Sequence, residues 1–368
     1  MTTESLDSPA AAKTADELVS RLFEATLGMF DVMSVYVGDR LGLYRALRDG
    51  GPATPTELAS RVPIDERYAR EWLEQQAVTG ILDVDDASAP QRDRRFSLPQ
   101  AYAAPLLDKD SLASIAPLAR SAVACAKVLP QLMSAYQSGG GVEWADYGPD
   151  MIESQGDFNR PWLVGSFGAE ILPQIPAIHD RLAADPPARV ADVACGVGWA
   201  AIAIARAYPD VHVDGFDIDA SSIELARANA SEAGVDDRVR FQLLDVAEAE
   251  AGAYDLVVVI EAIHDMTQPV TVLSSIRRML RPDGVALIAD EKTADAFTAP
   301  GDELERVYYG FSLFTCLPAA MTERPTAATG TVIRADTMRR LGTEAGFGNV
   351  ERLDKPELDM LRFYRLTP

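Results

Sequence analysis

Cysteine, histidine and lysine are scarce in this chain of 368 residues, which has three Cys, three His and five Lys. The cysteines, Cys125, Cys195 and Cys316, lie 70 and 121 residues apart and form no CxxC pair. This spacing excludes a disulfide framework and a cysteine-based zinc site, and it fits a reducing compartment. We therefore expect a cytoplasmic protein.

Long hydrophobic runs and an excess of positive charge are also missing. The N-terminus is acidic and lacks the apolar segment of a signal peptide, and the longest strongly apolar run, residues 195–205, is about half of a ~20-residue membrane span. The formal net charge is −22, because 56 Asp and Glu outnumber 34 Lys and Arg. Nucleic acids and anionic membranes attract basic surfaces, so we expect neither as a partner.

The composition is that of a globular protein, with 48% hydrophobic and 24% charged residues. At ~150 residues per domain, the length predicts about two domains. Residues 1–15 are expected to be a disordered tail, 16–137 a mainly helical domain, and 138–186 a linker loop and helix. Residues 187–368 then form an α/β domain with an insertion at 294–331.

The first region with helical periodicity covers residues 15–47 and predicts two helices. Its apolar positions are Leu18, Leu22, Phe23, Met29, Phe30, Met33, Val37, Leu41, Leu43 and Leu47. The first helix is apolar enough to need a partner surface. That surface is either the core of the same chain or the same helix in a homodimer, and the pattern fits both.

Residues 54–98 have the pattern of a winged helix. Thr54 and Glu57 form a capping box, and Asp65 begins a second helix. We expect that helix to bury Tyr68, Trp72, Leu73 and Ala77 on one face, followed by a two-stranded wing at 81–86 and 94–98. The pattern is typical of DNA-binding regulators, but residues 64–79 carry four acids and two arginines. Such a helix would repel DNA, which favours a structural or dimerising role.

A flexible break at residues 138–141 is followed by the aromatic and polar segment 144–162. We expect this segment to be a loop that faces a substrate or cofactor, with a helix near 158–181 leading into the second domain.

From residue 189 the sequence alternates between strands and helices. Short apolar strands are expected at 190–194, 211–218, 239–246, 254–262 and 284–291, with helices beginning near 199, 221 and 270. This pattern predicts a parallel sheet covered on both faces. One more helix at 336–346 and an antiparallel pair at 349–355 and 360–366 complete seven strands.

The first strand ends in the segment DVACGVGWAA, which contains GxGxxA, with Asp217 nineteen residues beyond Gly198. A dinucleotide-binding dehydrogenase would match both features. However, Asp192 lies inside the first strand and Asp245 lies at the end of the third strand. Acids at this rim suit a cationic ligand, such as an ammonium group, whereas a diphosphate prefers bare helix N–H groups.

Together these features resemble the class I S-adenosylmethionine-dependent methyltransferases, strongly over residues 187–295. The resemblance implies a Rossmann-like doubly wound sheet, S-adenosylmethionine as cofactor and S-adenosylhomocysteine as product. Asp217 is similar to the acid that binds the ribose hydroxyls, and Asp245 to the acid beside the adenine. The implied cofactor-binding residues are Asp192, Cys195, Gly196, Gly198, Asp217, Ile218, Asp245, Val246 and Glu261.

A winged-helix-like domain before the catalytic domain is the layout of small-molecule O-methyltransferases of the plant and antibiotic-tailoring type. His264-Asp265 resembles that family's pair after the fourth strand, although Met266 replaces the usual Trp. The resemblance implies a homodimer that methylates a small, aromatic hydroxyl acceptor with His264 as general base. Asp290 or Glu291 could orient the imidazole, and the sequence does not choose between them.

Other interpretations stay open at this point. The enzyme could methylate carbon or nitrogen, or the chain could be a winged-helix regulator that senses the cofactor without catalysis. His264 could merely form a local hydrogen bond. We expect no metal, because no His follows His264 and neither His179 nor His212 is an obvious partner.

The insertion at residues 294–331 is rich in aromatic and apolar side chains. It is expected to form a lid or an acceptor pocket, although some of its residues could instead pack against the N-terminal helices. Cys316, within this insertion, has no base nearby in sequence and is expected to be inert, and Cys195 is assigned no nucleophilic role.

Overall fold

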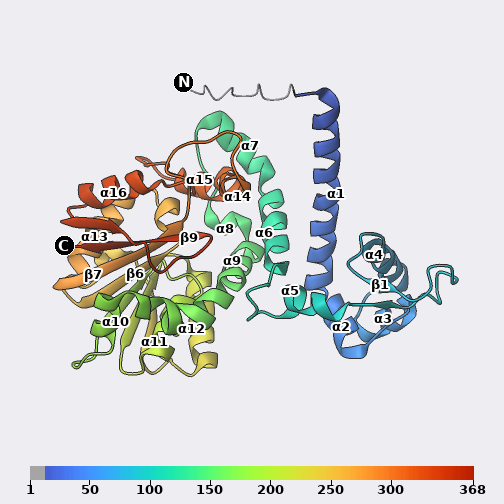
Figure 1. The fold of residues 1–368 in the computed structure, drawn as a ribbon, viewed down its shortest axis with the longest axis horizontal. Helices are drawn as coiled ribbons and strands as arrows, with labels where there is room; N and C mark the ends of the chain where they lie inside the picture. Colours follow the sequence, from blue (N-terminus) through green and yellow to red (C-terminus); the bar gives the residue numbers. More distant parts are fainter. Residues whose placement is uncertain (1–12) are drawn as a thin grey trace, which may run out of the picture. The chain divides into compact units, whose positions relative to one another are not determined.

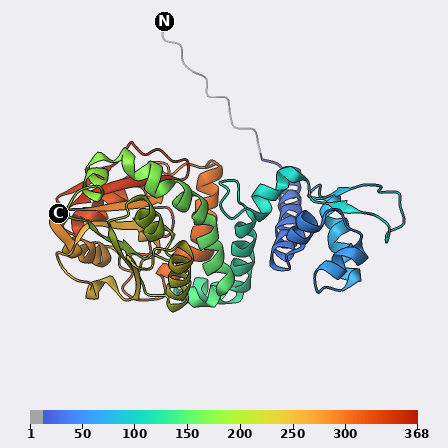
Figure 2. The ribbon, with the colours of Figure 1, turned by 90° about the horizontal axis from the view of Figure 1, so that it is seen from below.

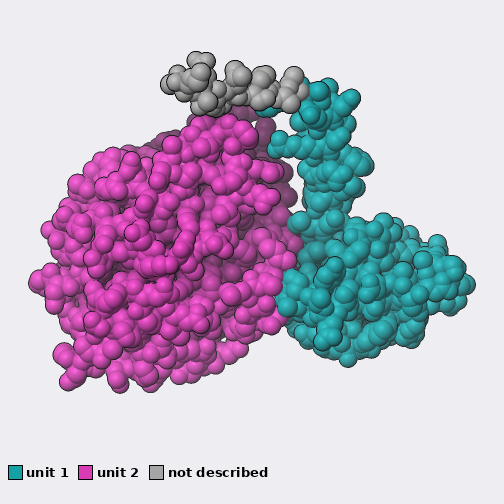
Figure 3. Space-filling view, in the orientation of Figure 1, with its two compact units in different colours: residues 1–107 teal, residues 108–368 magenta. Residues whose placement is uncertain are grey.

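The computed structural model describes residues 13–368, which divide into two compact units before and after Leu107 (Figure 3). Most of the predicted tail, residues 1–12, lies outside the described residues. Thr14 caps the first helix, so the chain is helical from Ala15 onward. None of the described helices combines the length and hydropathy needed to cross a bilayer.

The first unit is helical with one small hairpin (Figure 1). Its elements are α1 (Ala15–Arg40), α2 (Leu43–Gly50), α3 (Pro55–Arg61), α4 (Glu66–Val78), β1 (Asp83–Val84), β2 (Phe96–Ser97), the 3-10 turn η1 (Gln100–Tyr102) and α5 (Ala103–Leu107). Thr54 and Glu57 form the predicted capping box at the start of α3. β1 and β2 pair antiparallel and form the predicted wing.

The buried face of α4 differs in detail from the prediction. Ala69, Trp72, Leu73 and Gln76 are buried, whereas Tyr68 is 77% exposed. The prediction was therefore wrong for Tyr68. The buried stripe is centred between positions 72 and 73, so Tyr68 and Ala77 fall at its two edges.

The second unit is built around a seven-stranded sheet. Its elements before the sheet are α6 (Ala116–Lys127), α7 (Leu129–Ser138), α8 (Trp144–Tyr147), α9 (Pro149–Trp162), the π-helical segment η2 (Leu163–Ile171), η3 (Leu172–Gln174) and α10 (Pro176–Leu182). The sheet region contains β3 (Arg189–Val193), α11 (Trp199–Ala207), β4 (His212–Asp217), α12 (Ala220–Ala233), β5 (Val239–Leu243), η4 (Val246–Glu248), β6 (Tyr254–Ile260), η5 (Ile263–Asp265), α13 (Pro269–Met279) and β7 (Leu280–Glu291). After β7 come α14 (Glu303–Phe311), the π-helical η6 (Ser312–Cys316), α15 (Leu317–Ala320), α16 (Ala335–Glu344), β8 (Asn349–Arg352) and β9 (Leu361–Thr367).

The strand order is β5-β4-β3-β6-β7-β9-β8. β3 to β7 pair parallel, while β9 pairs antiparallel with both β7 and β8. This confirms the predicted seven strands with an antiparallel last strand. The chain runs outward from β3 to β5 and returns to β6 on the other side of β3, so the strand order reverses beside β3. Ligands of open α/β sheets bind at such a switch point.

Both faces of the sheet are buried, as the apolar strands predicted. Successive residues of one strand belong to different core clusters: Val258 of β6 lies in the cluster with α11 and α12, and Val257 lies in the cluster with α13 and α16. Figure 1 shows α11 and α12 on one side of the sheet and α13 and α16 on the other.

Residues 108–186 belong to the sheet-bearing unit, whereas the sequence predicted that the first domain extends to residue 137 and a linker follows. α6 and α9 lie side by side (Figures 1 and 2). Arg120 donates to Asp157 at 2.7 Å, and Ser121 Oγ donates to Ser154 Oγ at 2.8 Å. These contacts, of which the serine pair is buried, join the two segments, and the boundary between the units falls after Leu107.

The segment 144–162 is helical and not the predicted loop. Gly148, with φ of +77°, separates α8 from α9, and Pro149 occupies the first turn of α9. The backbone N–H of a residue in the first turn has no partner within the helix, so a proline there, which lacks that N–H, costs the helix no hydrogen bond. The breaks that suggested a loop therefore mark the junction of two helices.

Candidate active site

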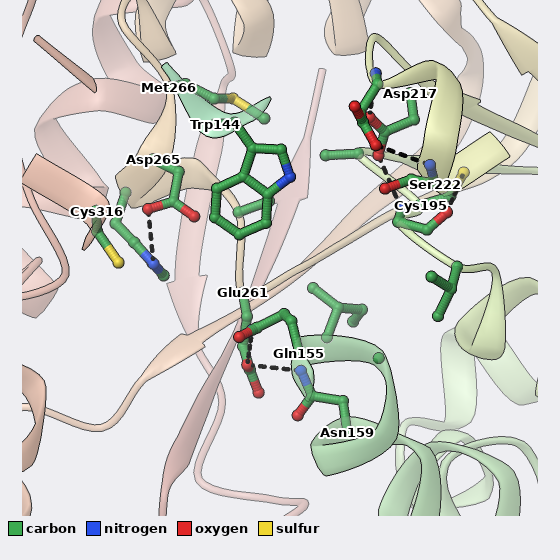
Figure 4. A pocket seen from close by; sticks show the side chains of 18 of the residues that line it. Trp144, Gln155, Asn159, Cys195, Asp217, Ser222, Glu261, Asp265, Met266 and Cys316 are labelled. Carbon is green, nitrogen blue, oxygen red and sulfur yellow. Dashed lines mark hydrogen bonds and ion pairs between the residues drawn. The ribbon is translucent and has the colours of Figure 1, made fainter. Parts of the chain in front are cut away.

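A cavity of about 1010 Å³ opens at the carboxyl ends of the parallel strands in the second unit. Figure 4 shows Asp217, Ser222 and Cys195 at one end, Asp265 and Cys316 at the other, and Trp144 and Glu261 between them. The cavity is lined by all of the residues proposed from sequence: Asp192, Cys195, Gly196, Gly198, Asp217, Ile218, Asp245, Val246, Glu261 and His264. The fold thus brings together residues that are up to 72 positions apart.

The glycine-rich loop after β3 has a backbone that needs glycine. Gly198 has φ of +87°, and a Cβ atom there would lie 2.4 Å from Cζ of Phe241. Asp217, at the end of β4, fixes the loop: its Oδ2 accepts a hydrogen bond from Gly196 N at 2.8 Å. Its Oδ1 accepts from Asp219 N at 2.9 Å. Each carboxylate oxygen keeps a further lone pair for a ligand hydroxyl.

Asp192 and Asp245 line the same end of the cavity in different environments. Asp192 is 1% exposed, and its Oδ2 accepts from Ala201 N at 3.1 Å. Burial raises the pKa of Asp192 to about 7, because a charged carboxylate loses hydration there. Asp245 is exposed, and its Oδ1 accepts from Ala247 N at 2.8 Å. Beside them, the Ile218 side chain is 79% exposed at the cavity.

His264 lies at the opposite end, in η5 after β6, and is 2% exposed. Its Nδ1 lies 2.8 Å from Asp290 Oδ1, within hydrogen-bond geometry, and 3.0 Å from Glu291 Oε2. Its Nε2 lies 3.4 Å from Asp265 Oδ1. Of the two acids that the sequence left open as partners, Asp290 is therefore the one that hydrogen-bonds to the imidazole.

The charges around His264 change its protonation. Burial lowers the pKa of the imidazole, but the carboxylates of Glu291, Asp265 and Asp290 more than offset this effect and raise the pKa well above its ordinary value. The surrounding carboxylates therefore favour the protonated form of the imidazole.

Cys316 has a base beside it, which the sequence did not show. Its Sγ lies within 4.8 Å of ligand atoms of His264 and Asp265. Burial raises the pKa of the Cys316 thiol to about 12, which favours the protonated thiol.

Two triplets of side chains have ligand atoms close enough for a metal ion: His264 with Asp265 and Cys316, and His264 with Asp290 and Glu291. Both triplets use the same imidazole, so a metal there would compete with acid–base chemistry at His264. The other histidines lie elsewhere. His179 Nδ1 lies 2.9 Å from Tyr208 Oη, and His212 is exposed at the start of β4.

Sequence reasoning missed the amide pair that holds Glu261. Asn159 Nδ2 donates to Glu261 Oε2 at 2.9 Å, and Gln155 Nε2 donates to the same oxygen at 3.5 Å. Glu261 has φ of +51°, an uncommon backbone conformation for a residue other than glycine, asparagine or aspartate. The four-residue spacing of Gln155 and Asn159 was the available signal, because it places both on one helical face.

Aromatic side chains form the walls of the cavity. Trp144 and Trp162 come from α8 and α9, while Tyr308 and Phe311 come from α14 in the predicted insertion. Tyr308 Oη donates to Met360 O at 2.6 Å. Phe297, also in the insertion, is 71% exposed and is not among the residues that line the cavity. The insertion thus supplies part of the cavity wall.

Comparison with known proteins matches two parts of the chain to described families. Residues 184–332 match a family model described as a methyltransferase domain, and residues 28–107 match the Rv2258c-like winged HTH domain. Residues 184–332 are a methyltransferase domain. The winged-helix pattern and the resemblance of the α/β domain are thereby confirmed.

One curated relative of the methyltransferase domain is 27-O-demethylrifamycin SV methyltransferase from Amycolatopsis mediterranei. It is 37% identical over 119 residues, which are 31% of this chain and 43% of that protein. The chain thus spans less than half the length of this relative.

Solved structures resemble nearly the whole chain in fold. Mitomycin 7-O-methyltransferase MmcR matches with a TM-score of 0.67 at 19% identity over 96% of this chain and 98% of its own. Human N-acetylserotonin methyltransferase, solved in complex with S-adenosylmethionine, matches with a TM-score of 0.68 at 16% identity over 97% and 98%. The chain therefore shares its fold with these proteins, and its methyltransferase domain has a Rossmann-like sheet and follows a winged-helix domain.

Proposed function

We propose that the chain transfers the methyl group of S-adenosylmethionine to the hydroxyl of a small, aromatic acceptor. The observation that carries this proposal is one cavity that runs from the glycine-rich loop to His264. The loop end has acids that suit a cationic nucleoside cofactor. The His264 end has aromatic walls and a titratable group.

The residues present fit the cofactor. Nothing lies within 4 Å of the Cβ position of Gly196, which lines the cavity, and Asp217 and Asp245 offer carboxylate oxygens at the rim. Asp192 would gain a cationic partner, which relieves the cost of burying its charge. The proposed set is the one named above: Asp192, Cys195, Gly196, Gly198, Asp217, Ile218, Asp245, Val246 and Glu261. When bound, S-adenosylmethionine supplies an electrophilic methyl group on a sulfonium.

His264 is the proposed general base. Its Nδ1–H donates to Asp290, which fixes the ring, so Nε2 is the nitrogen left to accept the proton of the acceptor hydroxyl. A raised pKa makes the neutral imidazole a stronger base and brings it nearer to the pKa of a phenol. The same shift lowers the fraction of neutral imidazole at pH 7. His264 is therefore expected to work best at alkaline pH.

Calorimetric titration with S-adenosylhomocysteine tests the cofactor assignment. Asp217→Asn should weaken binding at least about tenfold. An asparagine side chain has only one acceptor oxygen, so if that oxygen accepts from Gly196 N or from Asp219 N, the NH₂ group faces the other donor. Asp210→Asn changes an exposed acid in the turn before β4 and should leave binding unchanged. Absence of binding by the unmodified protein would contradict the cofactor proposal.

Transfer of a labelled methyl group, screened over phenols, catechols and keto acids, tests the acceptor class. His264→Ala should lower turnover while S-adenosylhomocysteine affinity stays within about twofold, since His264 lies at the other end of the cavity. Unchanged turnover would show that transfer proceeds without this base. Products methylated on carbon or nitrogen would favour the alternative chemistry.

A DNA-binding role is opposed by the charges on α4. Arg67 forms an ion pair with Glu71 on the same helix, and Arg94 of the hairpin lies 2.9 Å from Glu74. Side chains already paired with acids are poor ligands for phosphates. Specific nanomolar binding in a gel shift at physiological salt would overturn this view and favour a ligand-sensing regulator.

A homodimer through α1 is the proposed assembly. This helix is about 39 Å long for its 26 residues, and Gly38 is its one buried residue in the described chain. Its exposed apolar side chains include Val19 at 66%, Phe23 at 61% and Phe30 at 54%. An exposed apolar stripe of this length indicates a protein partner. The three free cysteines fit the proposed cytoplasmic location.

A further inference from the structure

The cavity has an unbalanced charge. Among the described residues that line it there are many acids and no Lys or Arg. At the cofactor end these acids are Asp192, Asp217, Asp219 and Asp245. Six more lie beyond them: Glu143, Glu261, Asp265, Glu291, Glu323 and Asp359. A ligand that carries a carboxylate, sulfate or phosphate would meet like charge at the acceptor end and no lysine or arginine among the described lining residues to pair with.

The deepest of these acids surround His264. One imidazolium faces the carboxyl groups of Asp265, Asp290 and Glu291, so three acidic groups share a single cationic partner. Asp265 Oδ1 and Glu291 Oε2 are buried atoms without a hydrogen-bond donor. Burial raises the pKa of both carboxyl groups. The side chain of Asp265 is still 37% exposed, and it lines the cavity.

Nearby arginines are already paired outside the lining. Arg120 Nη2 lies 2.7 Å from Asp157, and Arg160 Nε lies 2.7 Å from Asp110. The guanidinium of Arg160 also stacks on the Trp199 ring at 4.1 Å. These contacts hold the two guanidinium groups to other partners, so they do not neutralise Asp265.

The rest of the acceptor end also suits a cation. Glu143, Glu323 and Asp359 are exposed where they line the cavity, and carboxylates at an opening raise the local concentration of cations. The Trp144, Trp162 and Tyr308 rings line the interior. Aromatic faces attract ammonium groups, most strongly when water is excluded.

We propose that the acceptor is an aromatic compound that carries a positive charge, such as a protonated amine, and that Asp265 is its main charge partner. The identity of this ligand as the methyl acceptor rests on the proposed function. A sulfonium cofactor would supply one positive charge of its own. The test therefore uses S-adenosylhomocysteine, which lacks that charge, so that the acceptor's charge alone is measured.

Three probes share one phenol ring and differ in the charge at the end of the side chain: tyramine is a cation, 4-ethylphenol is neutral and 3-(4-hydroxyphenyl)propionate is an anion. Calorimetry on the full chain with S-adenosylhomocysteine should give a Kd for tyramine at least about tenfold below that of 4-ethylphenol. The anion should not bind at millimolar concentration. Equal affinity for cation and anion, or no binding of tyramine, would overturn the proposal.

Substitutions of acidic residues test which of them interacts with the positive charge of tyramine. Asp265→Asn should weaken tyramine about tenfold and leave 4-ethylphenol unchanged. The exposed pair Glu323→Gln and Asp359→Asn should weaken tyramine by a smaller factor, more at low ionic strength than at high. Asp354→Asn removes an exposed acid outside the lining and is the matched control. Equal losses for tyramine and 4-ethylphenol in Asp265→Asn would contradict a role in charge recognition.

Measurements of binding and of methyl transfer distinguish the proposed function from the proposed recognition of a cationic acceptor. Selective binding of tyramine without labelled methyl transfer to any acceptor would contradict the proposed function and leave the cation site standing. Transfer to 4-ethylphenol together with no preference for tyramine would support the proposed function and overturn the cation site.

Discussion

Nδ1 of His264 lies 2.8 Å from Oδ1 of Asp290, which joins the end of β6 to the end of β7. A carboxylate can only accept, so the imidazole donates from Nδ1 and presents Nε2 to the cavity. The hydrogen bond therefore fixes both the tautomer and the direction of the proposed base.

This relationship predicts a pH profile. The carboxylates around His264 raise its pKa, so the cation persists above pH 6.5 and the neutral base forms only at higher pH. We expect kcat/KM to rise with pH through an apparent pKa above 6.5. Asp290→Asn removes one of the charges and should move this rise to lower pH while it lowers the maximal rate. A kcat/KM profile measured over pH 5.5–9.5 checks this prediction.

Asp283→Asn changes an exposed acid in the same strand and should leave the profile unchanged. A profile with no ionisation in this range would contradict His264 as the base.

The buried Asp192 is predicted to lower the stability of the folded chain at neutral pH and to favour cofactor binding. Its pKa is about 7 in the folded chain, above the ordinary value of about 4, so folded protein binds this proton more tightly than unfolded chain. The favourable contribution is complete below pH 4 and is lost as pH rises to 7. Asp192→Asn should therefore raise the free energy of unfolding by up to about 4 kcal/mol at pH 8 and by a smaller amount, about 1.5 kcal/mol, at pH 5. Its affinity for S-adenosylhomocysteine should fall. Denaturant unfolding at both pH values measures this, and an equal effect at both would contradict the titration of Asp192.

Gly198→Ala should destabilise the glycine-rich loop. The substitution places an L residue at φ of +87° and a methyl group 2.4 Å from Phe241 Cζ, so the backbone must move. We expect a loss of about 2–4 kcal/mol and much weaker S-adenosylhomocysteine binding. Gly234→Ala is the matched control, because Gly234 has φ of +66° with nothing within 4 Å of its Cβ position. That variant should lose about 1–2 kcal/mol and bind normally. Similar behaviour of the two variants would show that the close approach to Phe241 is unimportant.

The exposed stripe on α1 predicts a concentration-dependent dimer. Phe23→Glu places a charge in the centre of the stripe and should produce monomers in sedimentation experiments at micromolar concentration. Arg21→Gln changes the net charge by the same amount on the opposite side of the helix and should leave the dimer intact. An unmodified protein that sediments as a monomer would contradict the proposed assembly.

Local patterns predicted much of the fold. Apolar strands followed by helices predicted β3 to β7 and the sheet covered on both faces, and the Thr54–Glu57 capping box predicted the start of α3. These features depend on neighbours in sequence, through hydrogen bonds within a turn or the alternation of side chains along a strand. The same logic failed at residues 144–162, where glycine and proline mark the junction of two helices.

The sequence by itself determined which chemistry the chain contains: a glycine-rich loop after the first strand of the sheet, acids at the ends of the next strands, and one histidine after β6. Only the tertiary structure decided that Asp290 hydrogen-bonds to His264, that Asn159 and Gln155 hold Glu261, and that Cys316 lies beside the imidazole. These pairs join residues between 26 and 106 positions apart, and their distances depend on how strands and helices pack. The charge of the cavity was decided in the same way, because a net charge of −22 does not tell which acids face one space without a lysine or arginine among them.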